Sequence, residues 1–151
     1  MAQSDNTTLN FQLNKPNSSE LKNFLINTGF KNRIPLDEYI NKVLKYADFI
    51  TLRSGNQIVG LSILYANRPE QDFAYITYIA LYPIFRGKGL GKKLLLFSCS
   101  FAQKKGYSIM RLEVDKNNLT AYKLYVSSGF LEYSMNQNSL YLEKKIRRNS
   151  N

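Results

Sequence analysis

The apolar residues of the chain recur at two spacings, one typical of helices and one typical of strands. Two segments near the start show the helical spacing: the first follows Asn17 and ends near Gly29, and the second opens at Pro35. After them the apolar runs become strand-like and are separated by turn-forming residues. The predicted strands are residues 47–53, 57–65, 73–82, 108–114, 130–135 and 140–146.

The clearest helical pattern comes after the third predicted strand. This helix is predicted to begin at Lys92 and to end at a Gly106 cap, and four apolar residues form one stripe along it. The stripe consists of Leu90, Leu94, Phe97 and Phe101. A shorter helix is predicted over residues 119–128. The resulting order, two helices, three strands, helix, strand, helix and two strands, indicates an α/β fold built on a mixed sheet.

The chain is long enough for one domain with a sizeable core. Its 151 residues are 44% hydrophobic and 13% aromatic, which suits a packed domain rather than a disordered chain. No repeat, low-complexity segment or interior linker interrupts it. We therefore expect a flexible start over residues 1–10, a single domain over residues 11–146 and a polar tail over residues 147–151. The basic residues near this end are expected to be solvated: Lys144, Lys145, Arg147 and Arg148.

The chain contains no histidine and a single cysteine, and these two counts exclude several kinds of chemistry. Ser-His-Asp and Cys-His nucleophile systems cannot be assembled, so any proton must move through Glu, Asp, Tyr, Lys, the backbone or water. A zinc site of His and Cys ligands is excluded too, and no metal is expected. Cys99 has no partner for an internal disulfide, suits a reducing cytoplasm, and is expected to be a buried or inert thiol.

The sequence indicates neither secretion nor membrane insertion. The first residues lack the basic and apolar regions of a secretory signal, and no apolar run approaches the roughly 20 residues that span a bilayer. We therefore expect a cytoplasmic protein without membrane contact. The formal net charge of +10 has two interpretations, a solvated lysine-rich surface or attraction of polyanions.

A glycine-rich turn holds the most informative residues of the sequence. Residues 86–91 read Arg-Gly-Lys-Gly-Leu-Gly, between the third predicted strand and the clearest helix. Glycine lets the main chain approach an anion closely, and the free N–H groups and the dipole of a helix N-terminus attract negative charge. The turn therefore predicts a polyphosphate site. The flanking basic residues are Arg86, Lys88, Lys92 and Lys93.

Two common phosphate-binding patterns do not fit this turn. A nucleoside-triphosphate loop needs Ser or Thr after Gly-Lys, and here Lys93 follows that pair. A dinucleotide fingerprint needs a glycine where the chain has Lys92 or Leu94. The pattern that fits is Arg-x-x-Gly-x-Gly, at Arg86, Gly89 and Gly91.

This pattern and two others resemble the GCN5-related N-acetyltransferase (GNAT) superfamily. Arg86-x-x-Gly89-x-Gly91 follows a strand and Leu112-Glu-Val114 lies on the next strand. The third motif is Asn118-x-x-Ala121-x-x-x-Tyr125-x-x-x-Gly129-Phe130. The resemblance covers roughly residues 47–146 and is strongest over residues 77–130. It implies a mixed, mostly antiparallel sheet whose central strands splay apart and are flanked by helices, as in acyl-CoA N-acyltransferases.

The resemblance also implies acetyl-CoA as the acyl donor. In this family the glycine turn binds the pyrophosphate, and the strand before it pairs its main chain with the pantetheine arm. The cofactor-binding residues that this implies are Ile79, Ala80, Leu81, Arg86, Gly87, Lys88, Gly89, Leu90, Gly91, Lys92, Asn118 and Tyr125. Asn118 is also suited to cap a helix, and both roles can hold at once. Lys92 or Lys93 is expected to steer the additional phosphate of the cofactor.

One tyrosine and one glutamate match catalytic positions of the family. Tyr125 matches the general acid that protonates the departing thiolate; the alternative is that it packs with Leu124 against the sheet. Glu113 matches the general base of some amine-acetylating relatives. Strand alternation places Glu113 on the opposite face from its two neighbours, so it points either into the cleft or to a helix-covered face, where its role would be structural. The weaker candidates for the base are Asp72 and Tyr75.

Together these features predict an acetyl-CoA-dependent N-acetyltransferase in which a primary amine attacks directly in a ternary complex. Two alternatives are an acyltransferase for another acyl-CoA, and a basic nucleic-acid- or ribosome-binding module with a vestigial cofactor slot. No aromatic-basic recognition motif is visible, so nucleic acid is not the expected partner. Both a monomer and a homodimer fit the sequence.

The identity of the acceptor amine depends on loops without a readable code. The elements expected to set it are the N-terminal helices and the loops at residues 30–36, 66–72 and 133–140. The basic surface favours an anionic acceptor, such as a nucleotide-linked amino sugar or an acidic peptide. Four aromatic residues are candidates for lining the acceptor pocket or, alternatively, for packing in the core: Phe30, Tyr39, Tyr65 and Tyr75.

Overall fold

A computed structural model describes residues 8–31 and 33–147 of the chain. Within these residues, seven strands form one sheet in the order β1-β2-β3-β4-β5-β7-β6, and every neighbouring pair is antiparallel except β4 and β5. The strands are β1 (Leu9–Gln12), β2 (Asp48–Ser54), β3 (Gln57–Tyr65), β4 (Phe73–Leu81), β5 (Ile109–Asp115), β6 (Leu131–Met135) and β7 (Ser139–Lys145). The predicted mixed, mostly antiparallel α/β sheet is therefore confirmed.

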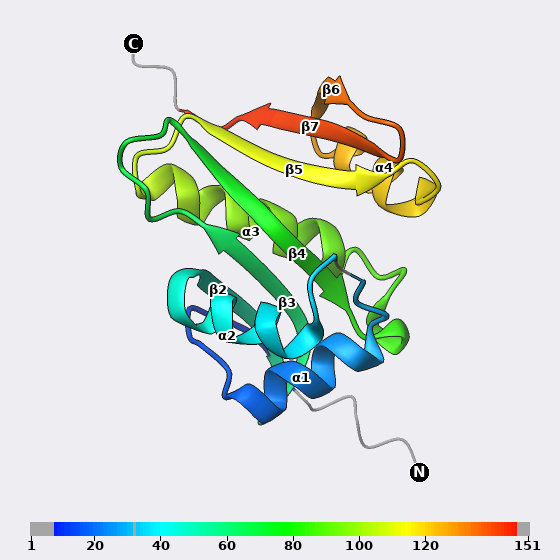
Figure 1. The fold of residues 1–151 in the computed structure, drawn as a ribbon. Coiled ribbons are helices and arrows are strands. Elements are labelled where there is room, and N and C mark those ends of the chain that lie inside the picture. Colours follow the sequence, from blue (N-terminus) through cyan, green and yellow to red (C-terminus); the bar gives the residue numbers. More distant parts are fainter. Residues whose placement is uncertain (1–7, 32, 148–151) are drawn as a thin grey trace.

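Helices cover both faces of this sheet (Figure 1). The α-helices are α1 (Ser18–Asn27), α2 (Leu36–Tyr46), α3 (Leu90–Lys104) and α4 (Leu119–Ser127), and a short 3-10 helix, η2 (Pro83–Phe85), follows β4. One hydrophobic core lies between the sheet and α3 with α4, and a second lies between the sheet and α1 with α2. No helix in the described part of the chain is long and apolar enough to cross a membrane.

Strand β1 was not expected from the sequence. Leu9 to Gln12 pair antiparallel with Ser54 to Thr51 of β2, so Leu9 and Asn10, which the sequence placed in a flexible start, belong to the sheet. Residues 1–7 lie outside the described residues. The ring of Phe11 stacks on that of Phe97 in α3, with centroids 5.1 Å apart. This long-range contact orders a segment that is too short to show a period of its own.

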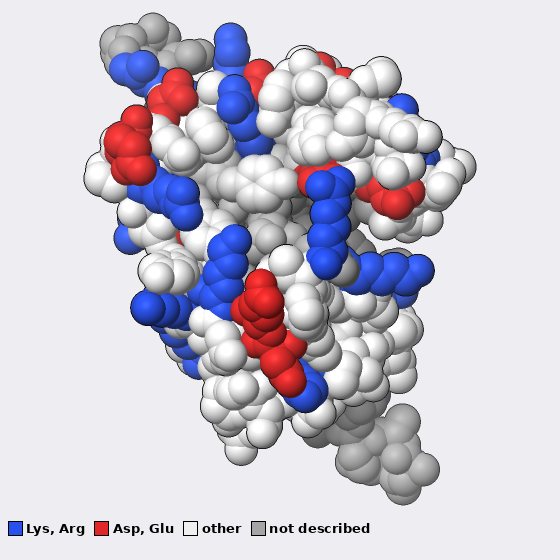
Figure 2. Space-filling view, viewed as in Figure 1, with Lys and Arg blue, Asp and Glu red and all other residues white. Residues whose placement is uncertain are grey.

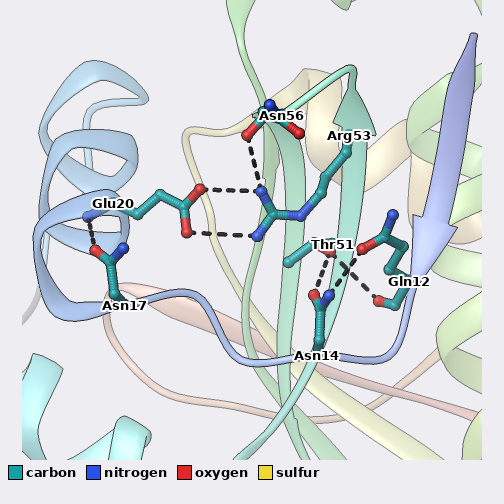
Figure 3. A network of polar contacts seen from close by, with 7 residues as sticks. All are labelled: Gln12, Asn14, Asn17, Glu20, Thr51, Arg53 and Asn56. Carbon is teal, nitrogen blue, oxygen red and sulfur yellow. Dashed lines mark hydrogen bonds and ion pairs between the residues drawn. The ribbon is translucent and has the colours of Figure 1, made fainter.

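Polar contacts fix the start of α1 against β2 (Figure 3). The guanidinium of Arg53 donates to the carboxylate of Glu20 at 2.9 Å and to the carbonyl of Asn56 at 3.0 Å. The Asn17 side chain caps α1 by accepting from the amide of Glu20 at 2.8 Å, as its predicted place at the helix start suggested. These contacts determine where α1, and the connection that follows it, lie over the sheet.

Helix α3 differs from its prediction in its start and in its buried face. It begins at Leu90, two residues before the predicted Lys92, and Gly91 lies inside it. The buried residues are Leu94, Leu95, Ser98, Cys99 and Ala102. Three members of the predicted stripe, Leu90, Phe97 and Phe101, are only partly buried and pack at the margin. The predicted stripe considered only large apolar side chains. The small side chains of Ser98, Cys99 and Ala102 are buried instead, because they let the helix approach the sheet closely.

Two smaller predictions concern Cys99 and the basic residues near the end. Cys99 is buried, as expected, and burial raises the pKa of its thiol to about 11. Lys144 and Lys145 belong to β7, where they pair with Met110 and Ile109 of β5, so they lie in the sheet and not in a tail, although Lys145 is exposed to solvent as expected. Residues 148–151, with Arg148, lie outside the described residues.

Candidate active site

The two central strands of the sheet separate halfway along their length. Phe73–Ile76 of β4 pair in parallel with Ile109–Leu112 of β5, and no pairing continues beyond Ile76 and Leu112. Figure 1 shows the two strands side by side at one end and diverging toward the other. The predicted splay of the central strands is therefore present.

A bulge at Thr77 coincides with the point of separation. Ile76 pairs with Leu64 of β3 and Tyr78 pairs with Ile63, so Thr77 is the extra residue in β4. A bulge of one residue reverses which face the following side chains occupy. Accordingly, Ile76 packs in the core under α3, whereas Tyr78 packs in the core under α1 and α2.

A cavity of about 590 Å³ occupies the space between the separated strands. Its walls come from β4, β5, α4, the start of β7 and the connection between α1 and α2. Six residues that the sequence offered as catalytic, cofactor-binding or acceptor-pocket candidates lie along it: Phe30, Tyr75, Ile79, Glu113, Asn118 and Tyr125. Residues distant in sequence thus share one cleft, of a size typical for small-molecule sites.

The glycine-rich turn follows β4 and η2 and leads into α3. Gly87 and Gly89 have φ angles of +78° and +80°, a conformation that glycine adopts without strain, and Gly89 is the N-cap of α3. Within the described residues, the amides of residues 87–92 donate no backbone hydrogen bond, and the first amide paired at this end is that of Lys93, to the carbonyl of Gly89. The turn is exposed and does not line the cavity itself.

The basic side chains around this turn make specific contacts. Arg86 Nε donates to the carbonyl of Leu81 at 3.1 Å, so one of the expected main-chain groups of β4 is already engaged. Lys88 Nζ lies 5.7 Å from the centre of the Phe85 ring. Lys92 Nζ donates to the carbonyl of Ser127 at 3.4 Å, at the end of α4. The two implied cofactor-binding residues before Leu81 differ in their surroundings. Ile79 lines the cavity, whereas Ala80 packs under α1 and α2.

Tyr125 lies on α4 and is only 7% exposed. Its ring packs against Phe130, with centroids 6.0 Å apart, and it also lines the cavity. Burial, with a smaller effect from the phenol of Tyr78, raises the pKa of Tyr125 to about 12. The hydroxyl is therefore protonated at neutral pH. Tyr125 thus packs against the core, as the structural alternative predicts, and also lines the cleft; its role as general acid stays a prediction.

Glu113 points into the cavity and not toward a helix. Its neighbours Leu112 and Val114 are buried in the core, so alternation places the Glu113 side chain on the other face of β5. Its carboxylate accepts a hydrogen bond of 2.5 Å from the hydroxyl of Ser139 in β7. Burial, and next the charge of Glu113, raise the pKa of Tyr75. Asp72, the other weaker candidate for the base, does not line the cavity.

Asn118 performs the capping role that its residue type suggests. Its side-chain oxygen accepts from the amide of Ala121 at 3.2 Å, at the start of α4. The same residue lines the cavity, so capping leaves it close to any molecule bound there.

The four aromatic candidates for the acceptor pocket separate into two pairs. Phe30 and Tyr75 line the cavity. Tyr39 is buried in α2 and its hydroxyl contacts that of Thr77 at 3.3 Å, while Tyr65 packs against the same core. Tyr39 and Tyr65 are therefore not cavity-lining residues.

Several cavity residues were not singled out in the sequence. They are Lys31, Arg33, Thr77, Tyr78, Asp115 and Ser139. The two basic residues belong to the loop at 30–36 that was expected to set specificity, but neither has a spacing that marks it. Ser139 reaches Glu113 only through the pairing of β5 with β7, which local sequence does not reveal.

Comparisons with known proteins agree with this geometry. A family model described as the acetyltransferase (GNAT) family matches residues 20–130. The chain is 39% identical over 64 residues to mycothiol acetyltransferase of Renibacterium salmoninarum, which covers 42% of this chain and 19% of that protein. It is 34% identical over 79 residues to the [ribosomal protein bS18]-alanine N-acetyltransferase of Haemophilus ducreyi, covering 52% of this chain and 54% of that protein.

A solved structure extends the likeness to nearly the whole fold. The crystal structure of a Bacillus subtilis acetyltransferase in complex with CoA superposes with a TM-score of 0.74 at 19% identity, covering 91% of this chain and 99% of that chain. The two curated relatives named above match over only about a fifth and about half of their own lengths. Since the family model spans most of the sequence, the chain belongs to the acetyltransferase (GNAT) family.

Proposed function

We propose that this protein transfers the acetyl group of acetyl-CoA to a primary amine by direct attack in a ternary complex. The observation that carries the proposal is the cleft between β4 and β5, in which Tyr125 and Glu113 line one cavity. It is supported by membership of the acetyltransferase (GNAT) family and by the CoA bound in the Bacillus subtilis structure.

The glycine turn fits the pyrophosphate of the donor. Its amides over residues 87–92 have no backbone partner among the described residues, and they lie at the positive end of α3. A Cβ atom added at Gly87 or Gly89 would meet nothing within 4 Å, so the space beside the turn is open. A diphosphate there would accept hydrogen bonds from amides that otherwise face water.

Two side chains provide the proton transfers of the proposed reaction. Bound acetyl-CoA supplies an activated thioester. Glu113 accepts a proton from the acceptor amine, directly or through water, as the nitrogen forms the new C–N bond and the C–S bond breaks. Tyr125 donates its hydroxyl proton to the departing thiolate. Once Glu113 has released its proton to solvent and Tyr125 has taken one up, the net transfer of the proton is from amine to thiol. Orientation of both reactants in the cleft supplies much of the rate.

Direct attack is favoured because the single cysteine does not line the cleft and the chain has no histidine to activate a hydroxyl there. The thiol of Cys99 lies in the core under α3, and its pKa is raised to about 11. The alternative of a nucleic-acid-binding module gains no support from the face that contains the cleft. Figure 2 shows Lys and Arg side chains at separate places on this face and not as one continuous patch.

The proposal is tested by binding and by turnover. Acetyl-CoA at about 100 times its dissociation constant is expected to stabilise the fold by roughly 2.7 kcal/mol in thermal unfolding. A panel of amines, comprising amino sugars, amino acids and peptides, is then assayed for release of free thiol from acetyl-CoA. The absence of any stabilisation by acetyl-CoA would contradict the proposed function. Greater thermal stabilisation by a longer acyl-CoA than by acetyl-CoA would identify the longer acyl-CoA as the donor.

A further inference from the structure

The cavity between β4 and β5 has charged residues of both signs. Lys31 and Arg33 line it from the connection between α1 and α2, and Glu113 and Asp115 line it from the end of β5. In Figure 2, basic and acidic side chains meet at the middle of the visible face, between the part formed by α1 and α2 and the part formed by β5 and β7. The cleft therefore presents positive and negative groups to the same bound molecule.

The basic residues follow a turn that is anchored to β4. The hydroxyl of Thr28 contacts that of Tyr78 at 2.6 Å, and the Phe30 ring lies 4.5 Å from Tyr39 and 5.2 Å from Tyr78, centre to centre. The amide of Phe30 also donates to the carbonyl of Leu25 at 3.0 Å. These contacts hold the start of the connection over the middle of β4, so Lys31 emerges from a fixed point.

This anchor places the start of the connection over the middle of β4 and away from the glycine turn. Tyr78 lies near the bulge in β4, whereas the glycine turn begins only after β4 has ended and does not line the cavity. Glu113, the proposed base, lines the same cavity as Lys31 and Arg33. An anion bound by these two residues would thus lie beside the attacking amine and apart from the pyrophosphate.

We propose that the acceptor is a small molecule or chain end that carries both a primary amine and an anionic group, either a phosphate or a carboxylate. Its amine is directed to Glu113 and Asp115, and its anionic group is bound by Lys31 and Arg33. This inference rests on the proposed acetyl transfer. A guanidinium and an ammonium form the charge-assisted hydrogen bonds that such anions accept best.

The charge pattern also disfavours two other acceptor classes. A polyamine would bring further positive charge against Lys31 and Arg33, where like charges repel. A neutral amine would gain nothing from these two residues. An acceptor with both charges can bind the basic and the acidic residues of the cavity at the same time. The preference is then the difference between its affinity and that of a polyamine or neutral amine.

The test compares acceptors that differ only in the anionic group. The phosphate arm uses glucosamine 6-phosphate against glucosamine, and the carboxylate arm uses γ-aminobutyrate against its amide, all assayed by thiol release. We expect the anionic member to have a kcat/KM about tenfold higher or more in at least one arm. The arm that responds identifies whether phosphate or carboxylate is recognised.

A double variant locates the effect. Lys31→Ala combined with Arg33→Ala is expected to remove the preference by raising the KM of the anionic acceptor, while the Kd of acetyl-CoA stays within about twofold. The matched control is Lys42→Ala, which removes an exposed lysine of α2 outside the cavity and is expected to change neither quantity.

Three results overturn the inference: faster turnover of the neutral member in both arms, a preference that persists in the double variant, or a Kd of acetyl-CoA that rises as much as the KM of the acceptor. The inference is also overturned if acetyl-CoA stabilises the protein but none of the anionic acceptors is acetylated. That result leaves the proposed function standing. Loss of stabilisation by acetyl-CoA in the unaltered protein contradicts the proposed function itself.

Discussion

At the scale of single residues, Tyr125 is buried and also lines the cleft. Its hydroxyl is expected to donate a proton, so Tyr125→Phe should lower kcat by about a hundredfold while leaving the Kd of acetyl-CoA nearly unchanged. The control is Tyr122→Phe on the same helix, because that hydroxyl contacts Glu132 at 2.8 Å and does not line the cavity. Unchanged turnover in Tyr125→Phe would remove this residue from the mechanism.

The raised pKa of Tyr125 has a consequence for pH dependence. The folded protein holds this proton up to a pH of about 12, whereas an unfolded tyrosine loses it near its ordinary value of 10. The burial therefore contributes stability below pH 10 that is lost as the pH rises from about 10 to about 12. We therefore expect deprotonation of Tyr125 to cause no fall in kcat below about pH 10, as measured in a kcat–pH profile. A fall in kcat near pH 8 that is present in the unaltered protein and absent from the profile of Tyr125→Phe would contradict this.

Ser139 is expected to position the carboxylate of Glu113. Since hydrogen bonds to charged groups contribute about 1.5–3 kcal/mol, Ser139→Ala should lower kcat roughly tenfold or more. Ser139→Thr keeps the hydroxyl and should restore most of the activity, whereas Ser134→Ala in exposed β6 serves as the control. Equal kcat values for Ser139→Ala and the unaltered protein, measured by thiol release, would show that the contact is only structural.

At the scale of elements, the glycine turn between β4 and α3 can be tested with matched substitutions. Gly89→Glu adds bulk and negative charge where the pyrophosphate is expected. Gly55→Glu, in the hairpin between β2 and β3, is the control, since both glycines have positive φ and open space beside them. Each variant should lose about 1–2 kcal/mol of stability from backbone strain.

Only Gly89→Glu is expected to abolish the thermal stabilisation by acetyl-CoA. Normal stabilisation of this variant would place the donor elsewhere. Loss of binding in both variants would attribute the effect to strain in general and not to the turn.

Most elements follow from local sequence, and the exceptions have physical causes. The hairpin turn at Gly55, the strands around it and the caps at Asn17 and Asn118 depend on nearby residues, so they were predicted within a few positions. Strand β1 depends on pairing with β2, which lies about forty positions along the chain by its register. The bulge at Thr77 arises from the register of β3 and β4, and no residue type marks it.

At the scale of the whole molecule, the pair of Arg53 and Glu20 joins α1 to the sheet. Their side chains are 13% and 28% exposed, and Arg53 Nε has no hydrogen-bond partner among the described residues. Glu20→Gln leaves a largely buried guanidinium without its carboxylate, so we expect the free energy of unfolding to fall by about 2 kcal/mol in urea.

The matched control for this pair is the exposed ion pair of Lys22 and Asp37, whose side chains are 45% and 76% exposed. Lys22→Ala is expected to change the free energy of unfolding by less than about 0.5 kcal/mol. A similar, small change in both variants would show that the Arg53 contact adds nothing beyond a surface pair.

The two sides of the candidate site differ in how far sequence predicts them. The proposed donor side comes from two short local motifs, the turn at 86–91 and the helix start at Asn118, so the spacing within each motif is readable. The proposed acceptor side is assembled from Lys31, Glu113 and Ser139, which lie on different elements and line one cavity only in the folded protein. Its composition could be known only once the strand order was known.

The separation of β4 from β5 also affects how the molecule responds to an occupant. Within the described sheet, the strands on either side of this break are joined only where residues 73–76 pair with residues 109–112. A long ligand lodged in the break would contact both halves, and so would resist any change in the angle between them. Binding of a ligand in the cleft is therefore expected to make the two halves of the sheet more rigid relative to each other.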